Sequence, residues 1–246
     1  MILSAIQNIN LGDGSILLID KPLRWTSFDV INKLKYEIRK NTGEKKFKIG
    51  HAGTLDPLAT GLLIVCVGKY TKKIPEFQNL DKQYTGTFIL GATTESYDLE
   101  HPPTNFQSLE GITLEKVRSV CQQFSGTILQ IPPIYSAVKI QGKSAFEYAR
   151  QGKDVDIKAK EITIHSFQIT HFNLPEIDFE ITCSKGTYIR SIARDLGELL
   201  GCGAYLKTLR RTQIGIFSVA DAYDISPLFS DHKNIHPTRI KRKFEE

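Results

Sequence analysis

The sequence KIGHAGTLDPLATGLLIVCVG, residues 48–68, joins a loop of small residues to a continuous apolar run. The run at residues 62–67 predicts a strand that ends at Gly68. Asp56 is the one acidic residue of the stretch, and Pro57 after it favours an extended backbone outside a helix. Glycines at positions 50, 53 and 61 permit turns with positive φ, or the close approach of a bulky ligand.

Two interpretations of Asp56 follow from its surroundings. An isolated Asp-Pro pair most often forms a turn. A carboxylate at a strand end, in a loop with His51 and few other charges, instead favours a nucleophile or a base. Such a carboxylate needs a cation or a hydrogen-bond donor to keep it ionised and oriented. The candidate partners are Lys21, Arg190, Arg210 and Arg211, and the spacing alone leaves all four open.

The rest of the chain mixes strands and helices without a regular alternation, which predicts an α+β fold. We expect strands at residues 15–20 and 82–91, an antiparallel pair at 161–169 and 177–184, and a loop at 129–133. Helices are expected from Ser27, as the cap, through residue 38, around 114–124, just before Gly152, and at 189–200 before Gly201.

Composition narrows the class of protein. The 246 residues are 41% hydrophobic and 24% charged, as in ordinary globular proteins. No apolar run approaches the ~18 residues that span a bilayer, and no basic flank precedes the first apolar residues, so we expect neither a membrane segment nor a signal peptide. The four cysteines are scattered and the six histidines lack ligand spacing. We therefore expect reduced thiols, no metal, no cofactor and a cytoplasmic location.

Basic residues are concentrated in three segments, NKLKYEIRKNTGEKKFKIG, YLKTLRRTQIG and PTRIKRKFEE. The net charge is +5 and the pI is about 8.9. This balance is compatible with a nucleic-acid partner and equally with solvated faces. From Ser226 onward the hydrophobic pattern gives way to polar and basic residues, which predicts a peripheral tail.

Several segments together resemble the TruB-type tRNA pseudouridine synthases. The matching segments, in the order that the family has them, are LLIDKP…TSFDV, GHAGTLDPLATGLL, DKQYTGTFILGATTESYD, IPPIYSAVKIQGKSAFEYARQG, CSKGTYIRSIARDLGELLGCGAYLKTLRR and GIFSVADA. They cover residues 15–222, and a long composite is far more specific than a short motif.

The resemblance implies the pseudouridine-synthase fold, a mixed and largely antiparallel sheet flanked by helices, with a central RNA-binding cleft. It implies a catalytic domain over residues 1–225 and a basic tail over 226–246 where many members carry a PUA domain. The implied activity converts uridine to pseudouridine at position 55 in the T-arm loop of tRNA, after the base is flipped out. It implies no cofactor, no membrane and no obligate protein partner.

The family's catalytic residues fall on three positions. Asp56 matches the catalytic aspartate, and attack on the uracil ring, attack on the sugar C1′ and assistance to an elimination all remain open for it. Tyr84 matches a tyrosine that packs on the target base and moves a proton. Arg190 matches the arginine that pairs with the aspartate.

Four further positions match residues that bind the substrate. His51 matches a histidine that fills the space left by everted loop nucleotides. Tyr188 and Leu209 match residues lining the uridine pocket. Lys21, followed by Pro22, matches a motif that supports the active-site loop.

One position departs from the family pattern: Arg24 stands where the family has a glycine in KP-x-G-x-TS. If that glycine serves a turn with positive φ, we expect the loop to be either strained or rebuilt here. Three other functions remain open beside the leading one: the same isomerisation on another RNA or within a guide-RNA assembly, an RNA-binding module without turnover, and a glycosidase. A glycosidase requires two carboxylates, and this motif supplies only Asp56.

Overall fold

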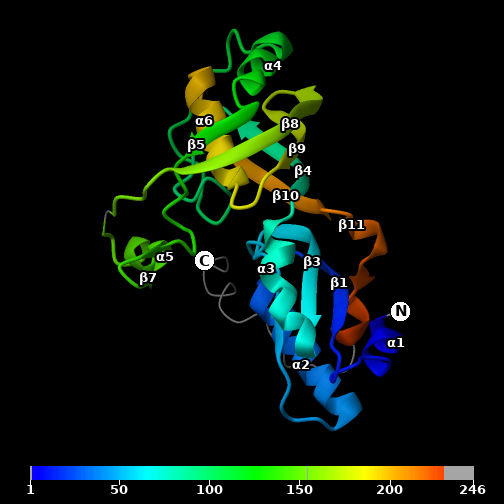
Figure 1. Cartoon of the computed structure of the whole chain (residues 1–246). Helices are drawn as coiled ribbons and strands as arrows, with labels where there is room; N and C mark the ends of the chain where they lie inside the picture. Colours follow the sequence, from blue (N-terminus) through cyan, green and yellow to red (C-terminus); the bar gives the residue numbers. More distant parts are fainter. Residues whose placement is uncertain (1, 154, 230–246) are drawn as a thin grey trace. The chain divides into compact units, whose positions relative to one another are not determined.

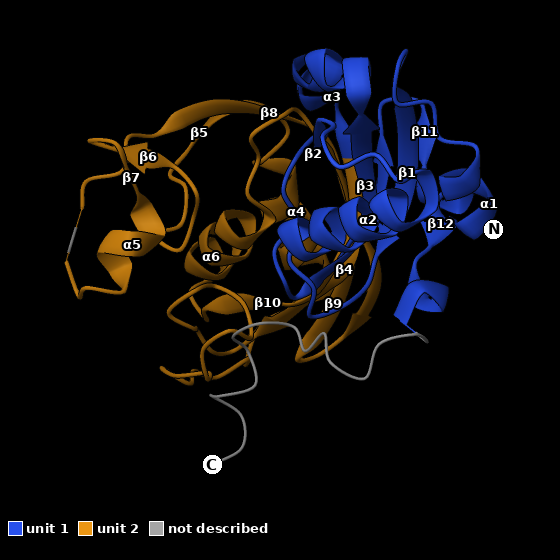
Figure 2. Ribbon diagram, turned by 90° about the horizontal axis from the view of Figure 1, so that it is seen from below, with its two compact units in different colours: residues 1–82, 210–246 blue, residues 83–209 orange. Residues whose placement is uncertain are grey.

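The computed structural model describes residues 2–153 and 155–229. The chain divides into two compact units (Figures 1 and 2). Unit 1 comprises Met1–Lys82 and Arg210–Glu246, and unit 2 comprises Gln83–Leu209. The chain therefore leaves unit 1, builds unit 2 and returns.

Unit 1 is built from helices and several strands of the main sheet. Its elements are α1 (Ile2–Gln7), β1 (Ser15–Lys21), α2 (Ser27–Thr42), β2 (Ile49–His51), β3 (Ala59–Val67), η1 (Gly68–Lys73), α3 (Ile74–Asn79), β11 (Phe217–Ser218), η2 (Val219–Asp221), β12 (Tyr223–Asp224) and η3 (Ser226–Phe229).

Unit 2 contains the long antiparallel pair of β8 and β9. Its elements are α4 (Leu114–Gln122), β5 (Gly126–Gln130), β6 (Lys139–Ile140), β7 (Lys143–Ser144), α5 (Ala145–Ala149), β8 (Lys160–Asn173), β9 (Glu176–Cys183) and α6 (Ile189–Leu200). Two strands carry the chain between the units, namely β4 (Lys82–Leu90) and β10 (Ala204–Ile214).

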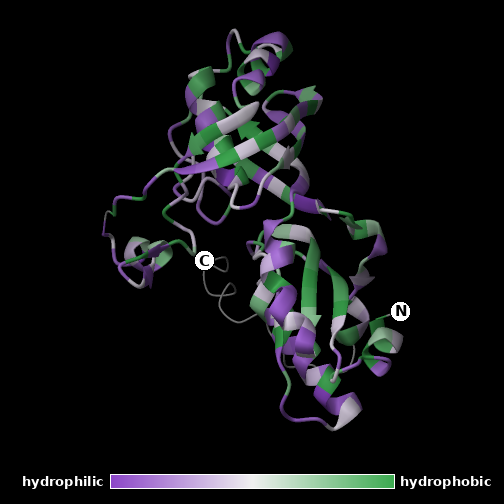
Figure 3. Ribbon diagram, viewed as in Figure 1, coloured by the Kyte–Doolittle hydropathy of each residue, from purple (hydrophilic) through white to green (hydrophobic). Residues whose placement is uncertain are grey.

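The predicted strand at residues 62–67 is confirmed as most of β3, and it is buried on both faces. In the strand order of unit 1, β12, β1, β3 and the end of β10 follow one another, with β2 also paired to β3. Because successive side chains alternate between faces, Leu63, Val65 and Val67 pack with α1 and α2. Leu62, Ile64 and Cys66 pack on the other side with residues of α3. In Figure 3, β1 and β3 are correspondingly drawn largely in the hydrophobic colour.

The α2 helix begins one residue away from the predicted cap. Thr26 is the N-cap and forms a capping box with Asp29. The prediction of Ser27 as the cap was therefore wrong: Ser27 is the first helical residue, and its hydroxyl contacts Leu55 instead. The predicted apolar stripe is confirmed, since Val30, Ile31, Leu34 and Ile38 are all buried.

The predicted antiparallel pair in unit 2 is confirmed as β8 and β9. Its core is aromatic: Phe88 and Phe179 stack with ring centroids 4.0 Å apart, and Phe167 meets both edge-on. The α6 helix covers residues 189–200 as expected and ends at Gly201 in the left-handed conformation. It is the most strongly amphipathic segment, and its apolar stripe explains why its bounds were predictable.

Two segments differ from expectation. The predicted loop at 129–133 is wrong at its start, because Leu129 and Gln130 close strand β5. β10 was not predicted, because its Lys207, Arg210 and Arg211 interrupt the apolar pattern. The fold class is confirmed: the sheet is mixed, with β1 and β12 parallel and the other assigned pairings described here antiparallel.

The first residues of the predicted tail pack on unit 1. Leu228 is buried against the cluster around α2, and Phe229 stacks on Trp25 at 4.5 Å between ring centroids. The rest of the predicted tail, residues 230–246, lies outside the described residues. The four cysteines are buried and free of disulfides. No helix within residues 2–153 and 155–229 is long and apolar enough to cross a membrane.

Candidate active site

The Asp56 loop is fixed to unit 1 at both of its ends. Before the loop, His51 of β2 pairs with Val65 of β3, and the Ala52 N–H donates to the Ile64 carbonyl at 2.9 Å. After it, the Ala59 N–H donates to the Asp56 carbonyl at 3.1 Å, and β3 begins. Asp56 is therefore a half-buried residue on a short loop between two paired strands.

Ser27 clamps the residue before Asp56. Its hydroxyl accepts from the Leu55 N–H at 2.9 Å and donates to the Leu55 carbonyl at 3.2 Å. Ser27 and Leu55 are both buried, so these bonds do not compete with water. The clamp fixes the backbone from which the Asp56 side chain extends.

Lys21 lies behind the same loop and is fully buried. Its Nζ donates to the carbonyls of Trp25 at 2.6 Å, Pro22 at 3.0 Å and Pro57 at 3.4 Å. Burial lowers the pKa of Lys21 to about 8, and the charge of Asp56 opposes that lowering. Lys21 is therefore a cation that acts on Asp56 at neutral pH; its part in substrate binding stays a prediction.

Replacement of Lys21 by Met should change how stability depends on pH. The unfolded chain keeps the proton up to pH 10.5, but the folded chain only up to about 8. Between these values the unfolded state holds more protons, so this group makes the free energy of unfolding rise with pH. The lowering of the Lys21 pKa from 10.5 to about 8 corresponds to a change in the free energy of unfolding on the order of 3 kcal/mol across this pH range.

Urea unfolding of both proteins at several pH values from 7 to 10 measures this contribution. The raised pKa values of Cys66 and Cys121 act in the opposite direction, but they are present in both proteins and cancel in the difference. We expect the free energy of unfolding of wild type, minus that of Lys21→Met, to increase steadily above pH 8. A difference that does not change with pH would show that folding does not lower the pKa of Lys21.

Arg211 supports the loop from β10. It is 1% exposed, and its guanidinium donates to the carbonyls of Leu62 at 2.8 Å and Gly53 at 3.0 Å. Gly61 allows this approach: it has φ of +103°, and a Cβ there would lie 2.2 Å from the Arg211 carbonyl oxygen. The Arg210 guanidinium instead donates two hydrogen bonds to the Asp20 carboxylate, at 2.7 and 3.0 Å.

His51 lies beside this cluster, at the end of β2, and is half-buried. Burial lowers its pKa, and the charge of Arg211 lowers it further, so the imidazole is neutral at pH 7. Its Nδ1 is buried without a hydrogen-bond partner among the described residues. The predicted contact of His51 with RNA stays a prediction.

Arg24 adopts the left-handed conformation that its glycine-like position suggested, with φ of 66°. Its N–H donates to the Pro57 carbonyl at 2.8 Å, so this turn also supports the Asp56 loop. A side chain in that conformation costs roughly 1–2 kcal/mol. The expectation of strain at Arg24 is therefore confirmed.

Replacement of Arg24 by Gly should raise the free energy of unfolding by about 1 kcal/mol, because the strain exceeds the added entropy of the unfolded glycine. Leu23→Gly is the matched control: Leu23 is also exposed but is not among the residues with positive φ, so that change should destabilise. Chemical denaturation measures both. A loss of stability in Arg24→Gly would contradict this account of the turn.

In unit 2, Arg190 lies in the first turn of α6 and is 4% exposed. Its guanidinium donates to the carbonyls of Tyr135 at 2.8 Å and Ser96 at 3.2 Å, and its Nε lies 3.6 Å from the Asp98 carboxylate. Asp98 is itself held by the Ser96 hydroxyl at 2.6 Å and the Glu100 N–H at 2.9 Å. Arg190 is thus a buried cation of fixed orientation.

The other predicted residues of unit 2 occupy three elements. Tyr188 is the N-cap of α6. The side chain of buried Gln130 accepts a hydrogen bond from the Tyr188 N–H at 2.8 Å and donates one to the Tyr188 carbonyl at 3.2 Å. Tyr84 lies on β4 and is 8% exposed. Leu209 is half-buried on β10.

Unit 1 thus brings together Asp56, Lys21 and His51, and unit 2 carries Tyr84, Tyr188, Arg190 and Leu209. The pairing of Asp56 with Arg190 joins residues of different units and stays a prediction. Three supporting residues were not predicted in these roles: Ser27, Asp98 and Gln130. Asp98 was recognisable in part, since it closes the matching segment DKQYTGTFILGATTESYD.

No group of three or more His, Cys, Asp or Glu side chains within the described ranges is arranged to hold a metal ion. In unit 1, the Asp56 carboxylate interacts with the buried ammonium of Lys21. This donor set suits acid–base or nucleophilic chemistry on an organic substrate.

Solved structures define the class. A chain in the structure described as "Crystal Structure of a Cbf5-Nop10-Gar1 Complex" is 25% identical, with a TM-score of 0.65 over 87% of this chain and 53% of that one. A second match is a chain of "the archaeal box H/ACA sRNP Nop10-Cbf5 complex", which is 22% identical with a TM-score of 0.62. The match covers 91% of this chain and 56% of that one, and it shows a shared fold. This chain spans about half the length of those two chains. The fold is that of the pseudouridine synthases.

The sequence identifies the family within that class. Residues 39–189 match the "TruB family pseudouridylate synthase (N terminal domain)", and residues 190–233 match the "tRNA pseudouridylate synthase B C-terminal domain". The tRNA pseudouridine synthase B of Flavobacterium johnsoniae is 54% identical over 87% of this chain and 94% of that protein. The tRNA pseudouridine synthase B of Phocaeicola vulgatus is 49% identical over 92% of this chain and 97% of that protein. The chain belongs to the TruB family. The two matches meet at the start of α6, inside unit 2, so they do not coincide with the compact units.

Proposed function

We propose that this protein converts uridine to pseudouridine at position 55 in the T-arm loop of tRNA. The observation that carries the proposal is the Asp56 loop, which buried groups hold from three sides: Lys21, Ser27 and Arg211. Relatives named tRNA pseudouridine synthase B, about 50% identical over nearly their whole length, support tRNA as the substrate.

The chemistry explains why a carboxylate suffices. The N1–C1′ bond of the nucleotide breaks, the C5–C1′ bond forms, C5 loses its hydrogen and N1 gains one. Nothing is oxidised or reduced, so the reaction needs no redox cofactor. We assign the attack on, or the assistance to, this exchange to Asp56, and the positive charge of Lys21 interacts with its carboxylate.

The remaining predicted residues have roles in exposing and holding the base. Flipping a nucleotide out of a stacked loop costs a few kcal/mol, which stacking and backbone contacts offset. We assign the stacking and lining to Tyr84, Tyr188 and Leu209, whose aromatic and apolar surfaces also exclude water from the detached sugar. Arg190, fixed by Asp98, is assigned to the Asp56 carboxylate.

A second candidate function is the same isomerisation within a guide-RNA assembly. The likeness to a chain of the Cbf5–Nop10–Gar1 complex favours it. At 25% identity over half of that chain, however, it is much weaker than the 54% identity over 94% of the Flavobacterium protein. Direct action on tRNA is therefore the proposed function.

Detection of pseudouridine in the RNA product tests this proposal. The purified chain is incubated with an unmodified tRNA transcript, and the RNA is digested and its nucleosides separated by chromatography. We expect one pseudouridine per tRNA, and none from a transcript in which cytidine replaces uridine 55. Pseudouridine at another position, or activity that requires an added guide RNA, would refute the proposal.

A further inference from the structure

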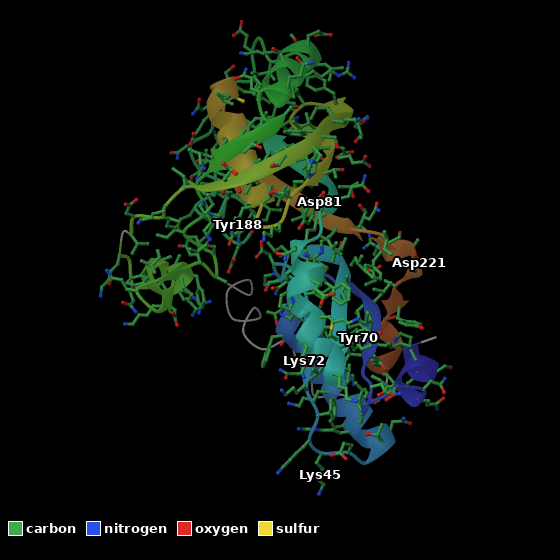
Figure 4. All side chains as sticks on the ribbon, viewed as in Figure 1. Lys45, Tyr70, Lys72, Asp81, Tyr188 and Asp221 are labelled. Atoms are coloured by element: carbon green, nitrogen blue, oxygen red, sulfur yellow. The ribbon has the colours of Figure 1, made fainter. Side chains whose placement is uncertain are left out.

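A cavity of about 470 Å³ opens in unit 1, at the end of β3 opposite to the Asp56 loop. Its wall includes four exposed lysines, Lys46, Lys48, Lys69 and Lys72. We refer to it as the lysine hollow. Figure 4 labels Lys72, which lines it, and Lys45, which precedes Lys46 in the chain.

Strand pairing brings these lysines together. Ile49 of β2 pairs with Val67 of β3, and the Gly68 N–H donates to the Lys48 carbonyl at 2.8 Å. The segment before β2 and the segment after β3 therefore run side by side. The gathering of the four lysines follows from the register of the sheet, not from a random distribution of surface charge.

The charge of the hollow is largely uncompensated. Its lining carries four lysines and one carboxylate, Glu44, so its net charge is 4 − 1 = +3. Among the described residues, only Lys69 of the four has a carboxylate partner, the exposed Asp13 at 3.3 Å. Like charges in one hollow repel one another and disfavour the folded state. An anion bound there would offset that cost.

The side chains indicate the kind of anion. Lysines act as mobile point charges that suit phosphate oxygens without fixing a geometry. The aromatic residue of the lining, Phe47, is partly buried against the hydrophobic core. A hollow with four lysines in its wall suits contacts to an RNA backbone, which do not depend on the identity of the bases.

The distance to Asp56 selects the part of the RNA. β3 has nine residues and separates the two places, which at about 3.3 Å per residue is roughly 26 Å. A T-arm stem of about five base pairs spans at most roughly 17 Å at about 3.4 Å per pair. If the stem of an RNA with its loop at Asp56 runs along β3, the nucleotides that reach the hollow lie beyond the stem of the T-arm.

We propose that the lysine hollow binds backbone phosphates of the tRNA outside the T-arm, as a second contact beside the catalytic loop. The proposal rests on the proposed function for its choice of RNA. It makes full-length tRNA a better ligand than the isolated stem-loop, by an electrostatic contribution that depends on salt.

The test compares two charge-matched double variants of the full chain. Lys48→Gln/Lys72→Gln removes two charges from the hollow, and Lys116→Gln/Arg118→Gln removes two exposed charges from α4. Binding of full-length tRNA and of a T-arm stem-loop is measured by fluorescence anisotropy at several salt concentrations. Thermal unfolding verifies that both variants are folded.

For the hollow variant we expect the salt slope with full-length tRNA to fall by about 1.5, and affinity at 0.1 M salt to fall on the order of tenfold. Binding of the stem-loop and the turnover number at saturating tRNA should not change. An unchanged slope, or an equal loss in the α4 variant, would overturn the proposal. These binding readouts do not depend on catalysis, so they remain decisive even if the proposed reaction is refuted.

Discussion

Asp56→Asn is expected to abolish pseudouridine formation while leaving RNA binding intact. The amide has nearly the shape of the carboxylate but cannot act as a nucleophile or a base, so we expect activity to fall on the order of 10⁴-fold or more. Tritium release from tRNA labelled at uridine C5 measures the reaction, because C5 loses its hydrogen when it becomes the glycosidic carbon. Filter binding of the same RNA measures affinity.

The control for this change is Asp221→Asn, which neutralises an exposed carboxylate of η2 in the same unit (Figure 4). It should keep wild-type activity. Residual turnover by Asp56→Asn within about tenfold of wild type would mean that another group performs the chemistry.

The second large effect is expected from Asp98→Asn. The change removes the negative charge beside buried Arg190, and breaking a buried ion pair costs several kcal/mol. Arg190 can then shift toward other acceptors, so its orientation is lost. We expect the turnover number to fall on the order of 10²-fold and KM to change little, because Asp98 acts through Arg190 and not on bound RNA.

Asp195→Asn provides the matched control. Asp195 also pairs with an arginine of α6, Arg194, at 2.6 Å, but both side chains are partly exposed. Exposed pairs contribute little, so this change should leave the turnover number near wild type. Equal losses in the two variants would mean that charge on α6 in general, and not the Asp98–Arg190 pair, supports catalysis.

Local sequence patterns predicted the elements whose hydrophobic periodicity is uninterrupted. The apolar run of β3, the stripe of α2 and the glycine after α6 each follow from one local rule. The positive φ at Arg24 was also foreseen, because a glycine in the family pattern marks a backbone requirement. The local chemistry of Asp56 allowed both a turn and a catalytic role, and the family resemblance favoured the catalytic role.

Local sequence patterns could not predict contacts between residues that are far apart in the chain. Arg211 interrupts the apolar pattern of β10, yet it is buried because two loop carbonyls accept its hydrogen bonds. Ser27 is a plausible helix cap by sequence, but Thr26 provides the cap and Ser27 binds Leu55, 28 positions later. Asp98 and Arg190 are far apart in the chain and are brought together by the fold of unit 2. In each case a tertiary partner determines the role of a polar side chain.

We propose that this chain, without a cofactor or guide RNA, rearranges uridine 55 of tRNA. The most direct measurement uses a transcript whose single uridine stands at position 55 and carries tritium at C5, with excess enzyme in buffer containing a metal chelator. We expect wild type to release one tritium per RNA. Tight binding of this RNA without any release would contradict it and would indicate a binding protein.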